Sequence, residues 1–109
     1  MKIGKWYQQG DVKIKRIAEI PEGGELITPD SRGHILAEGE VTGHCHRIAE
    51  TGNAVMTKTA DGKIYLRVTK AAPLKHDEHY VIIIEPGEYE VGRIFERDHL
   101  SRVTREVLD

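Results

Sequence analysis

The sequence predicts an all-β fold, a small antiparallel sandwich or barrel of about seven strands with a short C-terminal helix. Three observations support this fold class. From residue 8 to residue 84, apolar residues occur in short clusters separated by Gly, Pro, Asn and Asp, and no window keeps a 3.6-residue period. An Asp-Gly pair joins two segments rich in β-forming residues. The length of 109 residues suits one domain, which we place over residues 1–109 as a single β-domain.

The expected strands follow in chain order. Residues 11–15 alternate polar and apolar side chains as a half-buried strand does, and residues 33–41 are strand material interrupted by a glycine. The clearest element is a hairpin with arms at residues 55–59 and 63–68. Its connection is Ala-Asp-Gly, and Asp-Gly supplies the positive φ that a tight hairpin turn requires.

The last third of the chain predicts a second hairpin and the helix. Residues 79–84 are a continuous β-branched run, which is typical of a strand buried on both faces. Glu-Pro-Gly at 85–87 then turns the chain into a strand over residues 88–95. We expect an amphipathic helix over residues 98–108, capped by Asp98, with one apolar face formed by Leu100, Val103 and Val107.

Charge and composition exclude several classes of function. Sixteen Lys and Arg against eighteen Asp and Glu give a formal net charge of −2, so the chain lacks the basic field that holds nucleic acid. A local basic cluster keeps nucleic acid as a minor alternative; it comprises Arg93, Arg97, Arg102 and Arg105. No apolar run reaches the length of a signal-peptide core or the roughly 20 residues that cross a bilayer. We therefore expect a cytoplasmic protein with no membrane partner.

Histidines are the compositional anomaly, because four of the six form two local pairs. His44 and His46 are two apart, so in a strand both imidazoles lie on one side while Cys45 faces the other, where we expect it to be buried. His76 and His79 are three apart, and a turn would bring them together. Two such pairs on neighbouring strands predict one site for a divalent transition metal, and imidazole ligands suit zinc, nickel or iron.

The role of this metal site stays open at the level of sequence. Four protein ligands would close it and make it structural, whereas three would leave a position for water or a small-molecule ligand and permit catalysis. Glu78 is the candidate catalytic base beside a metal-bound water, and Glu50 is a second candidate carboxylate. His34 follows a possible turn and is expected at the surface or at a sheet edge, and His99 is expected as an exposed ring.

Two resemblances add to this interpretation. The pattern His44-x-His46-x-x-x-Glu50 resembles the first cupin motif, and this likeness implies a divalent metal bound inside a β-barrel. A likeness that covers most of the chain is to a family of small uncharacterised bacterial proteins, and it implies no particular activity. The segments that carry this second likeness are Gln8-Gln9-Gly10-Asp11-Val12, Gly39-Glu40-Val41-Thr42-Gly43-His44-x-His46-Arg47-Ile48, His76-x-Glu78-His79 and Pro86-Gly87-x-Tyr89-x-Val91. The family resemblance implies that the two histidine pairs and Glu78 act as one unit.

The alternative hypothesis is a non-catalytic protein–protein interaction module. In that case the histidine pairs are structural or face solvent, and exposed strand edges or the C-terminal helix contact a partner protein. Small β-domains with open edges also pair with their own copies, so a homodimer is a further expectation.

Overall fold

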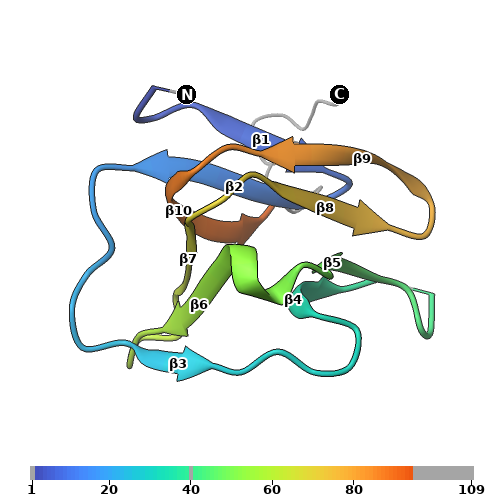
Figure 1. Cartoon of the computed structure of the whole chain (residues 1–109), viewed down its shortest axis with the longest axis horizontal. Helices are drawn as coiled ribbons and strands as arrows, with labels where there is room; N and C mark the ends of the chain where they lie inside the picture. Colours follow the sequence, from blue (N-terminus) through green and yellow to red (C-terminus); the bar gives the residue numbers. More distant parts are fainter. Residues whose placement is uncertain (1, 40, 95–109) are drawn as a thin grey trace, which may run out of the picture.

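The computed structural model describes residues 2–39 and 41–94 as two antiparallel β-sheets that pack on one another as a sandwich (Figure 1). This confirms the all-β prediction and selects the sandwich over the barrel. Within these ranges there are ten strands rather than about seven, and the helical content is one 3-10 turn, η1 (Thr51–Asn53). The helix expected over residues 98–108 and His99 lie outside the described residues. No helix in the described ranges is long and apolar enough to span a bilayer.

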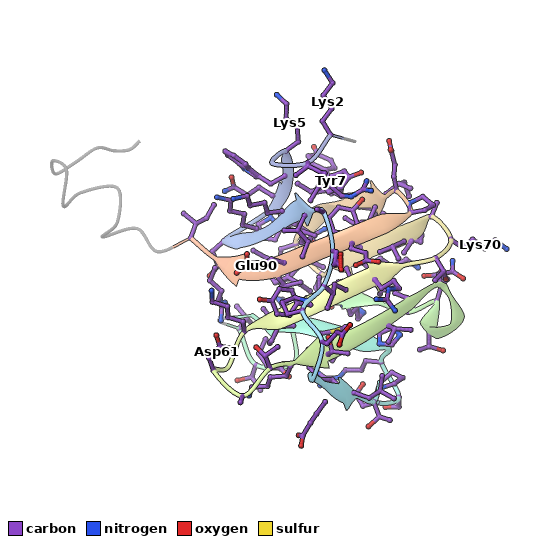
Figure 2. The ribbon with its side chains drawn as sticks, turned by 90° about the vertical axis from the view of Figure 1, so that its left-hand side faces the viewer. Lys2, Lys5, Tyr7, Asp61, Lys70 and Glu90 are labelled. Carbon is purple, nitrogen blue, oxygen red and sulfur yellow. The ribbon has the colours of Figure 1, made fainter. Side chains whose placement is uncertain are left out.

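The larger sheet has six strands in the order β1-β2-β10-β7-β6-β3. In Figure 2 the strands β2, β10, β7 and β6 cross the view side by side, with Glu90 labelled on β10. Every neighbouring pair in this sheet is antiparallel. The strand bounds are β1 Trp6–Gln9, β2 Val12–Ile17, β3 Glu25–Ile27, β6 Ala54–Lys58, β7 Ile64–Val68 and β10 Gly87–Arg93.

The smaller sheet has four strands in the order β4-β5-β8-β9. Their bounds are β4 His34–Glu38, β5 Cys45–Ile48, β8 Ala72–His76 and β9 His79–Ile84. Two register shifts interrupt its ladders, one between Ile35 and Ala37 of β4 and one between Leu74 and His76 of β8. In each case one strand carries an extra residue, which is the definition of a β-bulge, and bulges of this kind re-aim nearby side chains.

The predicted central hairpin is confirmed as β6 and β7, which pair from Ala54↔Val68 to Lys58↔Ile64. Its turn is closed by a backbone hydrogen bond from Thr59 N to Lys63 O of 3.0 Å. Gly62 has φ +89°, so the Asp-Gly pair supplies the left-handed residue for which the sequence analysis selected it.

The second predicted hairpin is wrong. The run at residues 79–84 does form β9, but β9 pairs with β8, and β10 lies in the other sheet between β2 and β7. The expected burial on both faces is also wrong, because β9 is an edge strand on which Tyr80 is 95% exposed and Val81 and Ile83 are more than half exposed. The β-branched run therefore predicts a strand correctly, but its position in the sheet depends on β8, a strand that was not predicted; it contains Pro73, a residue that is rare within strands.

The core lies between the two sheets. The largest fully buried side chains include Tyr89, Ile14 and Leu66 from the larger sheet and Ile48, Leu74 and Ile84 from the smaller one. Tyr89 donates its hydroxyl to Glu85 O at 2.6 Å, and burial raises the pKa of Tyr89 to about 12.

His34 was expected at the surface or at a sheet edge; the edge position is confirmed, but the side chain belongs to the interior, so the surface position is wrong. It opens the edge strand β4 but is only 4% exposed, and its Nε2 lies 2.9 Å from Thr51 O. The preceding Gly33 explains this burial, because the chain there lies against the backbone of Ile48 and Ala49 with no room for a side chain.

One open side of the sandwich is closed where β1 of the larger sheet lies beside β9 of the smaller one. Two side chains of β1 bridge the gap. The Tyr7 hydroxyl accepts a hydrogen bond from Glu85 N at 3.2 Å, and the amide nitrogen of Gln9 donates to Tyr80 O at 2.8 Å. This junction brings the end of β1 against the smaller sheet, next to the histidine pairs.

Candidate functional site

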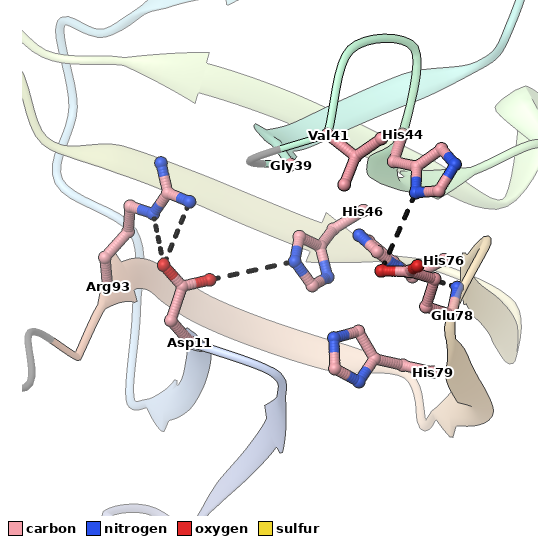
Figure 3. A pocket seen from close by; sticks show the side chains of 9 residues that line it. All are labelled: Asp11, Gly39, Val41, His44, His46, His76, Glu78, His79 and Arg93. Atoms are coloured by element: carbon pink, nitrogen blue, oxygen red, sulfur yellow. Dashed lines mark hydrogen bonds and ion pairs between the residues drawn. The ribbon is translucent and has the colours of Figure 1, made fainter.

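A pocket of about 250 Å³ lies next to this junction and contains both predicted histidine pairs (Figure 3). The prediction that the two pairs come together is therefore confirmed as geometry. Glu78, the candidate base, lines the same pocket. The complete lining is Asp11, Gly39, Val41, His44, His46, His76, Glu78, His79 and Arg93.

Strand alternation places the first pair. His46 lies in β5 and His44 immediately before it, and both line the pocket. Cys45 is fully buried and is not part of the lining, which confirms that it faces the opposite side as apolar filler. His46 is the most buried histidine of the pocket. It pairs with Ala37 next to the bulge of β4, where the ladder is irregular.

A hairpin places the second pair. His76 ends β8 and His79 begins β9, and the two residues are direct partners across a connection of two residues, Asp77 and Glu78. Partners across a ladder project to the same face, so both imidazoles reach the pocket. The Nδ1 atom of His76 accepts a hydrogen bond from Glu78 N at 3.0 Å, which ties this imidazole to the turn.

The four imidazoles form one contiguous cluster. Ring centroids are 4.3 Å apart for His46 and His76, 4.6 Å for His76 and His79, and 5.8 Å for His46 and His79. His44 joins this triangle through His76 at 5.9 Å, with its ring nearly perpendicular. Residues about thirty positions apart in the chain therefore present their rings to one small volume.

Gln9 holds the buried side of the cluster. It is 2% exposed, and its amide nitrogen donates to Leu74 O at 2.9 Å and to Tyr80 O at 2.8 Å. Its amide oxygen lies 2.8 Å from Nδ1 of His46, which is itself 2% exposed. A side chain of β1 thus contacts β5, β8 and β9 at once.

Charged groups flank the cluster on two sides. Asp11 Oδ1 lies 3.8 Å from His46 Nε2, and Arg93 holds the other oxygen of the same carboxylate, with Nη2 at 2.9 Å. On the opposite side Glu78 Oε1 lies 3.8 Å from His44 Nδ1 (Figure 3). That His44 nitrogen is buried and has no hydrogen-bond partner within the part of the chain that the structure describes. Both carboxylates thus approach an imidazole nitrogen without reaching hydrogen-bond distance.

Burial keeps the central imidazoles neutral. Burial, followed by the proximity of His76, lowers the pKa of His46 to about 4. The pKa of His76 is also lowered, first by burial and then by the neighbouring His79. A neutral imidazole has one nitrogen with a free lone pair, which is the form that binds a metal ion.

Two glycines leave the space that the rings occupy. Gly10 has φ +58°, and a Cβ built there would lie 2.8 Å from Nε2 of His79 and 3.2 Å from Cε1 of His46. A Cβ at Gly39 would lie 3.1 Å from Nε2 of His76. The histidine cluster thus depends on the absence of side chains at both positions.

Glu50 does not belong to this arrangement. It is exposed, precedes η1 and does not line the pocket. This position of Glu50 leaves the cupin likeness without support. Within residues 2–39 and 41–94, no three His, Cys, Asp or Glu side chains are arranged as a preformed metal site.

Three residues of the pocket region were not predicted as site residues from the sequence: Gln9, Asp11 and Arg93. Gln9 and Asp11 stand in one of the segments that carry the family likeness, Gln8 to Val12, and that was the only available signal. Nothing in their spacing relative to the histidines indicates contact, because Gln9 lies 37 positions from His46.

Comparison with known proteins places the chain in a family. Residues 8–94 match the model of a domain of unknown function, DUF8820, and the chain belongs to this family. The matched range includes every residue that lines the histidine pocket. No curated protein and no solved structure matches the chain.

Proposed function

We propose that the pocket binds one divalent transition metal ion through His44, His46, His76 and His79. The observation that carries this proposal is the spacing of the rings. With metal–nitrogen bonds of about 2.0–2.1 Å, two imidazoles on one tetrahedral ion have ring centroids roughly 5 Å apart. The four measured separations lie between 4.3 and 5.9 Å, on either side of that value.

The charge of the pocket also favours a cation. Two carboxylates, Asp11 and Glu78, stand against one guanidinium, Arg93, which already contacts Asp11. Because the central imidazoles are neutral, the two carboxylates and the guanidinium sum to a charge of −1, which attracts a divalent cation. Nitrogen-rich ligands with no thiolate suit zinc, nickel or iron better than calcium or magnesium.

Binding requires some of the rings to turn. His79 is exposed and His76 is half-buried, so the hairpin side of the cluster has freedom to reorient. If all four imidazoles bind, the ion is structural. If three bind, one position accepts water or a small-molecule ligand, and Glu78 is the candidate base beside it. We propose that this takes place in the cytoplasm.

Metal analysis of the untagged protein tests the proposal. We expect a near-stoichiometric ion by inductively coupled plasma mass spectrometry after loading with Zn²⁺, Ni²⁺ or Fe²⁺. We expect its loss in both double variants, His44→Ala/His46→Ala and His76→Ala/His79→Ala. His34→Ala is the matched control, because it removes a buried imidazole at the other end of the same strand pair and should leave metal content unchanged.

Two results would contradict the proposal: a wild-type protein that takes up none of the three ions, or equal metal content in the double variants and in wild type. The alternative, a protein–protein interaction module, would then be favoured. It stays a prediction: β9 exposes Tyr80, Val81 and Ile83, which could contact a partner protein.

A further inference from the structure

We infer that Gln9 is a positioning residue that presets His46 to bind the metal through Nε2. Gln9 lies outside the proposed ligand set. The orientation of the His46 ring follows from the hydrogen bonds alone, whereas the effect of Gln9 on metal affinity rests on the proposed function.

The first step is the orientation of the Gln9 amide. Its nitrogen lies 2.9 Å from Leu74 O and 2.8 Å from Tyr80 O. Backbone carbonyl oxygens only accept hydrogen bonds, so the group that faces them must be the NH₂ group with its two donors. The opposite orientation would place three acceptor oxygens together in a buried position and leave them unpaired. The amide oxygen of Gln9 therefore faces His46.

The second step is the tautomer of His46. The Gln9 oxygen can only accept, so Nδ1 of His46, at 2.8 Å, carries the hydrogen and donates it. A metal ion binds a neutral imidazole, and a neutral imidazole has a single N–H. The lone pair is then on Nε2, the atom that lies 3.8 Å from Asp11 in the pocket.

His76 does not share this preset. Its Nδ1 accepts a hydrogen bond from Glu78 N at 3.0 Å, so in the neutral ring the hydrogen is on Nε2. The two neighbouring imidazoles therefore hold opposite tautomers. Only the one that contacts Gln9 has its Nε2 ready for a metal ion.

Gln9 also sets the distance between the two histidine pairs. Its carbonyl partners, Leu74 and Tyr80, lie beside the bulge in the β8–β9 hairpin that carries His76 and His79. One buried side chain thus fixes both the ring of His46 in β5 and the hairpin that faces it. Partners that accept the second N–H of a metal-bound histidine typically contribute 10- to 100-fold in metal affinity.

The first experiment needs no metal. Long-range ¹H–¹⁵N correlation spectra of the metal-free protein report which nitrogen of each imidazole carries the hydrogen. We expect His46 as the Nδ1–H tautomer and His76 as the Nε2–H tautomer in wild type. An Nε2–H tautomer for His46 overturns the inference, whatever the metal result. Since this measurement uses the wild-type protein, it does not depend on the folding of any variant.

The second experiment measures Zn²⁺ and Ni²⁺ affinity by competition with a chromophoric chelator. We expect Gln9→Leu, which removes the acceptor, to bind 10- to 100-fold more weakly and to lose the fixed tautomer. Gln9→Glu keeps an acceptor for Nδ1–H, so it should recover part of the lost affinity. Gln8→Leu is the control, because Gln8 is the exposed neighbour on the same strand and should bind as wild type does.

The two claims fail in different ways. Wild-type affinity in a folded Gln9→Leu overturns the positioning role while the proposed metal site stands. A wild-type protein that binds neither ion overturns the proposed function and with it the claim about affinity. In that case a His46 tautomer that changes in Gln9→Leu still identifies Gln9 as the residue that orients the ring.

Discussion

The histidine pocket has two sides that differ in how firmly they are held. On the β5 side, His46 and Gln9 are each 2% exposed and hydrogen-bonded to one another. On the side of the β8–β9 turn, His79 is exposed, His76 is half-buried, and the Glu78 side chain is 61% exposed. One side is thus ordered by the protein interior, whereas the exposed side chains of the other have the freedom to reorient that the proposed metal binding requires.

This difference has a consequence for energetics. A buried side chain contributes to folding and to the site together, and its loss leaves a cavity and unpaired partners. An exposed side chain at a turn contributes to the site with little effect on folding. Variants on the two sides should therefore separate stability from metal binding.

The largest effect is expected when one histidine on each side of the pocket is replaced by alanine. His46→Ala should abolish measurable metal binding and lower the free energy of unfolding by about 2–4 kcal/mol, because it leaves a cavity and an unpaired Gln9 oxygen. His79→Ala should also weaken metal binding at least tenfold, but change the unfolding free energy by less than about 0.5 kcal/mol. Urea denaturation of the metal-free proteins, beside metal titration, measures both quantities. Equal destabilisation by the two variants would contradict the distinction between the sides.

A smaller effect is expected from substitution of Gly10. Comparison with a control glycine separates the loss of space for the imidazole rings from the strain of the backbone. Gly10→Ala places a Cβ against His79 Nε2 and should lower metal affinity about tenfold, in addition to roughly 1 kcal/mol of backbone strain at φ +58°. Gly62→Ala is the matched control, since Gly62 also has a positive φ, +89°, but no atom lies within 4 Å of the added Cβ. It should show a similar loss of stability with unchanged metal affinity. A parallel loss of affinity in Gly62→Ala would remove the steric explanation.

The sequence predicts the parts of this molecule that depend on local order. The β6–β7 hairpin follows from Asp-Gly between β-forming segments, and the pairing of His44 with His46 follows from strand alternation. His76 and His79 come together because their own turn joins them. Each of these predictions depends on residues that are near one another in the chain.

The failures all involve contacts between distant residues. The β-branched run of β9 was expected in a buried hairpin with β10, but its partner is β8, and nothing local indicates that an exposed edge results. His34 was expected at the surface or at a sheet edge; it lies on an edge strand but is buried, and this burial depends on Gly33 meeting Ile48 in another strand. Gln9 was not recognised as a site residue because its partners lie 37 to 71 positions away. Patterns of spacing contain no information about such pairs.

A further prediction compares the two carboxylates. Asp11 lies on the β5 side of the pocket, and its side chain is 41% exposed. Glu78 lies at the β8–β9 turn, and its side chain is 61% exposed. Screening by water weakens the pull of an exposed charge on an ion. We expect Asp11→Asn to lower metal affinity by about three- to tenfold and Glu78→Gln by less than about threefold at low salt. Metal titrations at two ionic strengths test which variant loses more affinity. A larger loss in Glu78→Gln than in Asp11→Asn would indicate that Glu78 binds the ion directly.

The smallest expected effect is the pH dependence of the metal-free protein. The pKa of His46 is about 4 in the folded state and 6.5 in the unfolded chain, so between these values the unfolded chain binds more protons. The contribution of His46 to the free energy of unfolding should therefore be constant above pH 6.5 and should decrease as the pH is lowered toward 4. From pH 7 to pH 6 the expected loss is under about 1 kcal/mol. His46→Gln should show a shallower slope than wild type. Identical slopes in the two proteins would mean that His46 is not held neutral by its burial, and the β5 side of the pocket would lose its main electrostatic distinction from the turn.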